Sequence, residues 1–557
     1  AVPDTIQGVI MARIDRLPPE DKRLLQAASV VGMEVSFGLL KAIAAVPEER
    51  LDVGLTHLQR AELLYETRLS PEITYTFKHA LTCQVAYDSL LQGRRHALHA
   101  RIVEAIETLY ADRLADQVER LAYHALKGEV WGKALTYCRQ TGAKACAHSA
   151  YQGAVARFEQ ALVALQHLPD KPDTREQGID LRFDLRNALL ALGEHSRILE
   201  HLRQAETLAE ALNDQRRLGQ ISAYLTEYFR QTGEPDRAVE CGQRALSLAT
   251  ALGDFPLQVL ANYFLGTAYH DLGDYRRALD CLRQNVASLA GDRLHDHFGL
   301  PGLASVLCRA RLVSCAAEMG AFAEGTARSE EAVRIAESVD HLFSRTMAYF
   351  GVGDLSLRQG DLPKAISMLE RGLQLCRVAN IHTWSPTVGA ALGYAYALSG
   401  RVAEGLSLLQ QAVEQAASMG ISAIQSRRLA YLSEAYLLAG HLDEATDLAG
   451  RALALARDLK ARGYEAYALC CVGEIHLHQD PSEIDAAEAA YRQALTLADE
   501  LGMRPLLAHC HLGFAALYRL MGRLEQAHAE LSKAIELFHA MHMTFWLSRA
   551  EAGVVQA

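Results

Sequence analysis

The sequence has few residues of the kinds that interrupt helices or build cross-linked scaffolds. Only 14 of its 557 residues are proline, and runs of β-branched residues are rare. The 11 cysteines include no Cys-x-x-Cys pair, which excludes a zinc site of that type and a disulfide framework. We therefore expect a folded, helix-rich protein in a reducing, cytoplasmic setting, too long for a single core.

Long apolar runs, an excess of basic residues and catalytic motifs are also missing. No run of about 18 apolar residues occurs, so we expect no membrane span. The net charge of -11 argues against nucleic acid as the main ligand. There is no G-x-x-x-x-G-K-[ST] phosphate loop and no G-x-S-x-G nucleophile elbow. We expect a chain that is not an enzyme and needs no cofactor.

Histidine pairs are the remaining candidates for metal ligands. Pairs two residues apart on a helix diverge by about 200°, so they cannot chelate together. His295 and His297 instead fall in an expected loop beside Asp292 and Asp296. We regard this pair as a weak candidate and predict no metal site.

A period of 40 residues dominates the chain after about residue 180. Five residues after each repeating glycine from Gly233 onwards stands a small residue such as Ala238 or Ala445, and four before it there is often Tyr or Phe. One step is 47 residues long, which predicts an inserted loop over 290–301, and a two-residue insertion falls near Gln479. The repeating glycines are Gly193, Gly233, Gly273, Gly320, Gly360, Gly400, Gly440 and, after that insertion, Gly522.

This pattern of residues around each glycine predicts two amphipathic helices joined by a short turn, with small residues where the helices cross closely. The spacing resembles the tetratricopeptide pattern, whose usual unit is 34 residues, in a variant with longer helices. We predict an all-α tetratricopeptide solenoid superhelix of ~40-residue helical hairpins. An irregular hairpin over 131–149 and 151–167 and a polar connector over 169–177 precede it.

Residues 1–110 lack the repeat. Helical periodicity covers roughly 4–16, 19–31, 36–44 and 48–60. Two short strands, 63–67 and 73–77, flank the turn 68–72, and a helix follows over about 79–91. This order predicts a small winged-helix domain. Acidic residues slightly outnumber basic ones here, so we do not expect it to bind DNA.

Residues 2–32, 63–91 and 94–107 resemble the segment that follows the nucleotide-binding core in STAND-class signalling ATPases. The likeness is greatest to a bacterial group in which an adenylate/guanylate cyclase domain precedes an AAA-like ATPase and a tetratricopeptide tail. The resemblance implies that the winged helix packs on an ATPase and that the repeats act as a sensor. Because the chain does not begin with Met, we expect it to be the middle of a longer polypeptide.

The resemblance implies a role for one residue. Residues 77–81 stand where related ATPases have a Met-His-Asp-Leu motif, whose histidine contacts the β-phosphate of ADP. His79 matches that histidine, whereas Lys78 and Ala80 replace the Met and Asp. His79 is therefore a candidate nucleotide sensor; alternatively it caps the helix that begins there.

In tetratricopeptide arrays the first helix of each hairpin lines the inner groove. Projected onto this sequence, that pattern predicts a partner-binding groove of acidic and tyrosine residues suited to an extended peptide with basic side chains. The candidate residues are Glu227, Arg230, Tyr263, His270, Asp354, Tyr394 and Glu434.

We divide the chain into a winged-helix domain (1–112), a helical linker with the first hairpins (113–175), the repeat array (176–541) and a capping helix (542–557). The predicted function is a non-catalytic sensor that binds a protein or peptide, or the upstream ATPase, and regulates a nucleotide switch. Two alternatives stay open: a free-standing tetratricopeptide adaptor, and the regulatory part of a transcriptional activator like the maltose-regulon activator.

Overall fold

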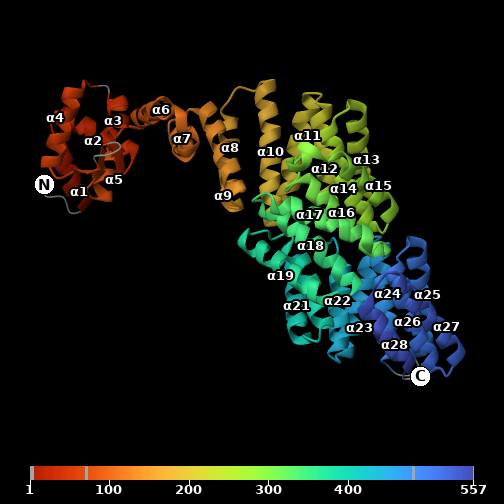
Figure 1. Cartoon of the computed structure of the whole chain (residues 1–557). Coiled ribbons are helices and arrows are strands. Elements are labelled where there is room, and N and C mark those ends of the chain that lie inside the picture. The colour runs from red at the N-terminus through yellow and green to blue at the C-terminus, as the bar shows by residue number, and fades with distance from the viewer. Residues whose placement is uncertain (1–5, 45, 69–72, 480–482, 556–557) are drawn as a thin grey trace. The chain divides into compact units, whose positions relative to one another are not determined.

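The computed structural model describes residues 6–44, 46–68, 73–479 and 483–555 (Figure 1). It forms two compact units. The first, called here the N-terminal unit, comprises Ala1–His148 and Gln152–Leu185; the second, the repeat unit, comprises Ser149–Tyr151 and Arg186–Ala557. No helix among the described residues is long and apolar enough to cross a membrane.

The N-terminal unit begins with short helices around a small sheet. Its first elements are α1 (Ile6–Asp15), α2 (Pro19–Val31), β1 (Glu34–Ser36), α3 (Phe37–Ala44), α4 (Glu48–Arg60), β2 (Leu64–Arg68), β3 (Thr74–Phe77), α5 (Ala80–Asp88) and α6 (Gln92–Leu109). Every helix and both strands predicted for residues 1–91 are thus present. The predicted turn 68–72 lies outside the described residues beyond Arg68.

The sheet is antiparallel with strand order β1-β3-β2, so the last strand lies in the middle. The prediction from sequence missed β1, which is only three residues long and gives no readable alternation. Its buried Val35 pairs with Tyr75 of β3. This layout contains the helices and the hairpin that suggested a winged helix, and that name stays a prediction.

Further helices continue to the boundary between the units: η1 (Ala111–Gln117), α7 (Val118–Lys127), α8 (Trp131–Ala147), α9 (Tyr151–Gln166) and α10 (Pro172–Leu192). The irregular hairpin expected around 131–167 is α8 and α9. The prediction of a polar connector over 169–177 is wrong, because α10 begins inside that range at Pro172. Proline suits the first position of a helix, because an amide hydrogen there would have no partner within the helix. The division between the units falls within α10, and the predicted domain boundaries stay predictions.

The repeat unit consists of consecutive helical hairpins, each a first and a second helix. They are α11 (His195–Ala211), then the pairs α12 (Gln215–Thr232) and α13 (Pro235–Leu252), α14 (Phe255–Leu272) and α15 (Tyr275–Ser288), α16 (Ala304–Met319) and α17 (Phe322–Glu337), α18 (Leu342–Gln359) and α19 (Leu362–Val378), α20 (Ser385–Leu398) and α21 (Val402–Ser418), α22 (Gln425–Leu438) and α23 (Leu442–Asp458), α24 (Arg462–Leu477) and α25 (Ile484–Leu501), α26 (Arg504–Leu520) and α27 (Leu524–Ala540), and the terminal α28 (Thr544–Val555).

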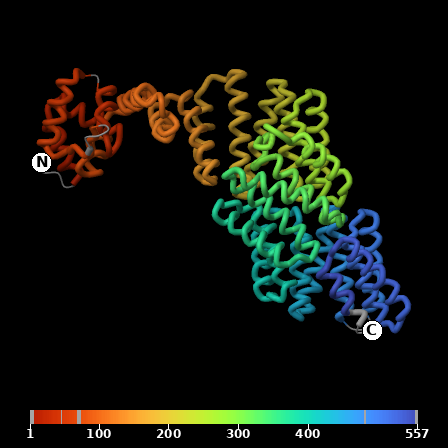
Figure 2. Tube along the Cα trace, viewed as in Figure 1, coloured from red at the N-terminus to blue at the C-terminus, as the bar shows by residue number. Residues whose placement is uncertain are grey.

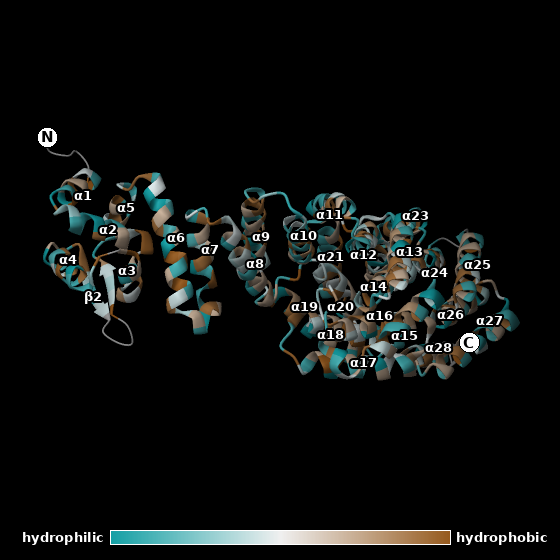
Figure 3. Cartoon of the chain, turned by 90° about the horizontal axis from the view of Figure 1, so that it is seen from above, coloured by the Kyte–Doolittle hydropathy of each residue, from teal (hydrophilic) through white to brown (hydrophobic). Residues whose placement is uncertain are grey.

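The repeating glycines end the first helices. Gly273, for example, follows α14 with a φ of +84°, a left-handed conformation that glycine adopts without steric cost. The small residues five positions later are buried where the two helices of a hairpin cross; Ala238 and Ala445 have no exposed surface. Figure 3 shows hydrophobic and hydrophilic residues alternating around the helices, as amphipathic packing requires.

The 47-residue step holds a folded insertion between α15 and α16. It contains the short helix η2 (Gly291–His295), and Leu300 and Leu303 are buried. The hydroxyl of Tyr224 on α12 donates to the carbonyl of Gly299 at 3.1 Å. The insertion predicted from the spacing is therefore present, and it packs against an earlier repeat. The insertion near Gln479 falls mostly on residues outside the described part.

Repeats far apart in sequence contact one another as the repeat unit coils (Figure 2). The amide of Ser422 donates to the carbonyl of Gln231 at 2.8 Å, and the amide of His382 donates to the carbonyl of Ala191 at 3.0 Å. An added Cβ on Gly273 would lie 2.8 Å from the amide nitrogen of Gly463. Later repeats therefore close against earlier ones, which covers much of the inner face.

Candidate ligand-binding site in the repeat unit

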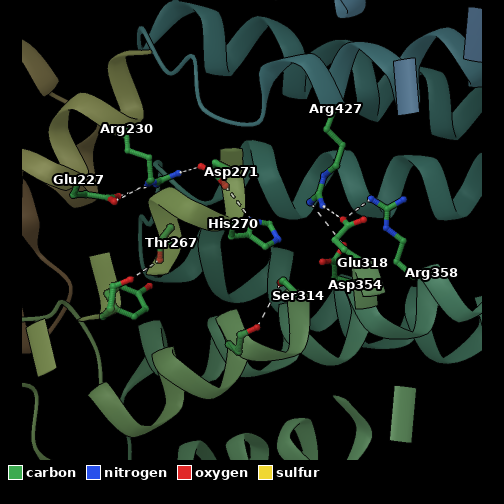
Figure 4. Close-up of polar contacts among 12 residues, drawn as sticks. Glu227, Arg230, Thr267, His270, Asp271, Ser314, Glu318, Asp354, Arg358 and Arg427 are labelled. Carbon is green, nitrogen blue, oxygen red and sulfur yellow. Dashed lines mark hydrogen bonds and ion pairs between the residues drawn. The ribbon is translucent and has the colours of Figure 1, made fainter. Parts of the chain in front are cut away.

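Buried ion pairs fill the inner face of the early repeats (Figure 4). Arg230 on α12 donates to Glu227 at 2.8 Å and to Asp271 at 2.5 Å. Burial alone would lower the pKa of Arg230, but the two carboxylates outweigh it and raise the pKa above its usual value. His270 contacts the other oxygen of Asp271 at 3.1 Å. The guanidinium and the two carboxylates of this cluster are therefore paired with one another.

A second cluster centres on Glu318 at the end of α16. Its side chain is 1% exposed and accepts hydrogen bonds from Arg358 at 3.0 Å and from the Tyr467 hydroxyl at 2.8 Å. Arg427 lies 3.7 Å from both Glu318 and Asp354. The four helices α16, α18, α22 and α24 thereby meet through one polar cluster in the interior.

The predicted groove residues all lie on first helices. Six of them are less than one-tenth exposed, and only Glu434 is half-buried. Five are therefore covered by their own chain, whereas Tyr394 and Glu434 line an open cavity. Their places are α12 for Glu227 and Arg230, α14 for Tyr263 and His270, α18 for Asp354, α20 for Tyr394 and α22 for Glu434. Binding of a partner by any of them stays a prediction.

The cavity has a volume of about 470 Å³ and is walled by α18, α20, α22, α24, α26, α27 and α28. This volume lies within the range of small-ligand sites in proteins. Its apolar wall includes Leu398, Leu437, Leu512 and Trp546. Seven helices from consecutive repeats thus converge on one space.

Stacked tyrosines and two carboxylates form the polar wall. The rings of Tyr394 and Tyr431 stack with centroids 4.1 Å apart and planes 4° from parallel. The Tyr394 hydroxyl donates to Glu434, and the Tyr491 hydroxyl donates to Glu474 at 2.7 Å. The buried Tyr431 hydroxyl has no hydrogen-bond partner among the described residues.

The two carboxylates differ from those of the buried clusters. Burial raises the pKa of Glu434 to about 7, while the Tyr394 hydrogen bond and the charge of Arg358 act in the opposite direction. In the part of the chain that the structure describes, neither Glu434 nor Glu474 forms an ion pair. Arg358, Arg427, Arg519 and Arg549 line the same cavity.

His79 is exposed and occupies the N-cap position of α5. Its side chain makes no capping hydrogen bond; its backbone carbonyl accepts from the amide of Thr82 at 3.0 Å instead. Its role towards a nucleotide is untested. The rings of His297 and His341 contact each other at 5.0 Å, and residues 6–44, 46–68, 73–479 and 483–555 hold no cluster that fits a metal ion.

Sequence reasoning missed Glu318, Arg358, Arg427, Tyr467 and Glu474. A signal for Glu474 was present: it stands 40 residues after Glu434, which stands 40 after Tyr394. The spacing that located the glycines therefore also locates one position per repeat along the inner face. Glu318 and Arg358 are also 40 residues apart, whereas the contacts of Arg427 and Tyr467 with Glu318 follow no such spacing.

The repeat unit is an all-α solenoid of tetratricopeptide type. The tetratricopeptide repeat family model matches residues 259–285, which cover most of α14 and part of α15. That match spans less than one full 40-residue hairpin.

Known proteins resemble longer parts of the chain. It is 24% identical over 315 residues to the 43 kDa receptor-associated protein of the synapse from Tetronarce californica, covering 56% of this chain and 73% of that protein. A Rap protein solved in complex with competence and sporulation factor has 13% identity and a TM-score of 0.49, over 66% of this chain and 98% of its own. A STAND protein with a tetratricopeptide repeat sensor from Pyrococcus horikoshii has 13% identity and a TM-score of 0.35, over 100% of this chain and 67% of its own.

Proposed function

We propose that the repeat unit binds a protein or peptide partner and that the chain itself is not catalytic. The observation that carries the proposal is the cavity of about 470 Å³ that the consecutive first helices share with α27 and α28. Its wall combines apolar side chains with polar groups that lack partners in the described part of the chain. Solenoids of helical hairpins commonly use such concave surfaces to hold extended ligands.

The finer proposal concerns what binding does. Residues 2–32, 63–91 and 94–107 resemble the segment after the core of STAND-class ATPases, which supports a sensor arm attached to an upstream nucleotide switch. A ligand changes such a switch only through its different affinities for the two states. An adenylate/guanylate cyclase would then be a candidate output domain. The transcriptional-activator alternative has the same module with a DNA-binding output domain. The adaptor alternative has the repeat unit with no ATPase.

Filling the cavity tests the binding proposal. Ala516 lines the cavity and is exposed, so Ala516→Trp places an indole there without disturbing the core. Ala403, exposed on the second helix α21, gives the matched control Ala403→Trp. Fluorescence polarisation with a labelled pentapeptide library should show peptides that bind the wild type and the control and that Ala516→Trp rejects. Equal binding by all three proteins would overturn the proposal.

Two further observations separate the finer alternatives. A phosphate-loop motif in the reading frame upstream of Ala1 would support the ATPase, and a start codon there would support the adaptor. Calorimetric titration of this chain with ADP should show no binding, because the sequence has no phosphate loop. Binding that His79→Ala abolishes would contradict this account and assign His79 a direct role.

A further inference from the structure

Arginines outnumber acidic residues on the wall of the cavity. Burial raises the pKa of Glu434 to about 7, so near neutral pH this side chain carries only part of a negative charge. The wall therefore has an excess of positive charge, and the ligand that complements it is an anion. The arginines are Arg358, Arg427, Arg519 and Arg549, and the acidic residues are Glu434 and Glu474.

Two of these arginines are buried and have unused hydrogen-bond donors (Figure 4). Arg358 is 9% exposed and donates to Glu318 at 3.0 Å, while its Nε has no partner among the described residues. Arg427 is 5% exposed and lies 3.7 Å from the carboxylates of Glu318 and Asp354, beyond hydrogen-bond distance. It forms no hydrogen bond within the part of the chain that the structure describes. Unused donors of a buried guanidinium are costly unless another group accepts from them.

The two guanidinium groups lie close enough to bind one ligand together. Both approach the same oxygen of Glu318, and their central carbons lie 5.8 Å and 5.7 Å from the ring centroid of Tyr431. The side chains of Glu318 and Asp354 are each 1% exposed and are not among the residues that line the cavity. An acceptor in the cavity can therefore reach Arg427 without breaking a hydrogen bond.

The other two arginines add positive charge where the wall is exposed. Arg519 and Arg549 are exposed, and neither forms an ion pair with a residue that the structure describes. The guanidinium of Arg549 lies 4.4 Å from the ring centroid of Phe545 instead. Exposed charges of one sign attract a ligand of the opposite sign and increase its rate of association.

We propose that the cavity binds a glutamate or aspartate side chain of a peptide, whose carboxylate accepts hydrogen bonds from Arg358 and Arg427. A neighbouring apolar residue of the peptide contacts the apolar wall of the cavity. A carboxylate suits this site better than a phosphate, because Glu434 and Glu474 on the same wall would repel a second negative charge. This inference rests on the proposed binding function and defines the chemistry of its ligand.

The experiment uses the whole chain and acetyl-Ala-Leu-Xaa-Leu-Ala-amide peptides in which Xaa is glutamate, glutamine, aspartate, asparagine or lysine. Glutamine and asparagine keep the shapes of the two acids without their charge. Calorimetry should show each acidic peptide binding about tenfold or more tightly than its amide counterpart, the effect of about one charge-assisted hydrogen bond. The lysine peptide should bind no more tightly than the neutral peptides. Glutarate and a glutamine peptide with a free C-terminus are titrated separately.

Variants connect this preference to the wall of the cavity. Arg427→Gln should remove most of the preference for acidic peptides, and Arg519→Gln and Arg549→Gln should reduce it less. Glu474→Gln should strengthen the binding of acidic peptides, because it removes a repelling charge. Arg377→Gln, at an exposed position of α19, is the matched control and should keep the preference of the wild type. Circular dichroism establishes that each variant is folded. If Arg427→Gln is not, Arg519→Gln, Arg549→Gln and Glu474→Gln remain as the test.

The outcomes separate the two proposals. Acidic and amide peptides binding equally, with Ala516→Trp blocking both, would overturn the carboxylate site and keep the binding function. The lysine peptide binding most tightly would have the same meaning. No binding by any of these peptides or by the library would overturn both proposals. Tighter binding of glutarate or of the free C-terminus than of the blocked glutamate peptide, with loss in Arg427→Gln, would replace the side chain by a free acid or a peptide terminus.

Discussion

Arg358 donates to Glu318 at 3.0 Å, and the two residues occupy the same position in consecutive repeats, 40 residues apart. Tyr394 and Glu434 are related in the same way. The repeat thus brings side chains of equivalent positions together on the inner face. They form hydrogen bonds because one repeat has a donor at that position and its neighbour has a carboxylate. This relationship links the period of the sequence to the polar interior of the repeat unit.

Removing the charge of Glu318 should destabilise the repeat unit strongly. Glu318→Gln leaves the buried Arg358 without its carboxylate and weakens the contact with Arg427. We expect a loss of about 3–5 kcal/mol in the free energy of unfolding, measured by urea denaturation. The matched control is Glu404→Gln, whose ion pair with Arg401 at 2.7 Å is exposed and screened by solvent, so that its loss should lower the stability far less. Similar losses for the two variants would contradict the structural role of the cluster.

Glu434→Gln should stabilise the protein above neutral pH. Burial raises the pKa of Glu434 from 4.5 to about 7, so the folded state opposes ionisation. Stability is therefore full below the unfolded pKa of 4.5 and decreases as the pH rises towards the folded pKa. At about 1.4 kcal/mol per pKa unit the upper limit is roughly 3 kcal/mol, and we expect about 1–2 because the side chain is half-buried.

The measurement is the unfolding free energy of the wild type and of Glu434→Gln at pH 5 and pH 8. The two proteins should differ little at pH 5, and the variant should be more stable at pH 8. The exposed Glu414→Gln should follow the wild type at each pH. A variant less stable than the wild type at pH 8 would show that the ionised carboxylate has a cation that stabilises it.

Two glycines with similar backbone geometry should respond differently to alanine. Gly273 and Gly440 have φ values of +84° and +79°, so alanine costs about 1–2 kcal/mol at each through the left-handed conformation. At Gly273 the added Cβ also lies 2.8 Å from the amide nitrogen of Gly463, whereas at Gly440 nothing lies within 4 Å. Gly273→Ala should therefore lower the melting temperature more than Gly440→Ala. Equal decreases would mean that the contact between distant repeats contributes nothing.

The N-terminal unit should lose stability in mild acid through two buried histidines. His99 and His124 contact each other through their Nδ1 atoms at 2.8 Å, and burial lowers the pKa of His99 to about 4 and that of His124 to about 3. Both imidazoles are neutral in the folded state. Their contribution to the free energy of unfolding is therefore full above the unfolded pKa near 6.5 and is lost as the pH falls below it. By pH 5 the loss is up to about 2 kcal/mol for each histidine.

Thermal unfolding between pH 7 and pH 5 measures this effect. His124→Phe removes one titrating group and should make the unfolding transition of the N-terminal unit less sensitive to pH. The exposed His148→Phe is the control and should keep the sensitivity of the wild type. An unchanged pH dependence in His124→Phe would show that another group governs acid unfolding.

The sequence by itself determined the repeating hairpins. The spacing of the glycines, the small residues after them and the amphipathic period depend only on contacts within one hairpin and its neighbours. Gly233, Ala238 and the inserted loop near residue 290 could therefore be located from the spacing alone. The short strand β1 and the start of α10 could not, because three residues carry no period and a polar first turn resembles a linker.

Only the tertiary structure decided what the inner face holds. Small rotations between successive repeats add up, and their sum determines whether Ser422 meets Gln231 or remains far from it. That closure buries Glu227, Asp354 and their neighbours in ion pairs and leaves Tyr394 and Glu434 in a cavity. No local pattern records the accumulated rotation, so the sequence indicated an inner face and the structure showed which part of it a ligand can reach.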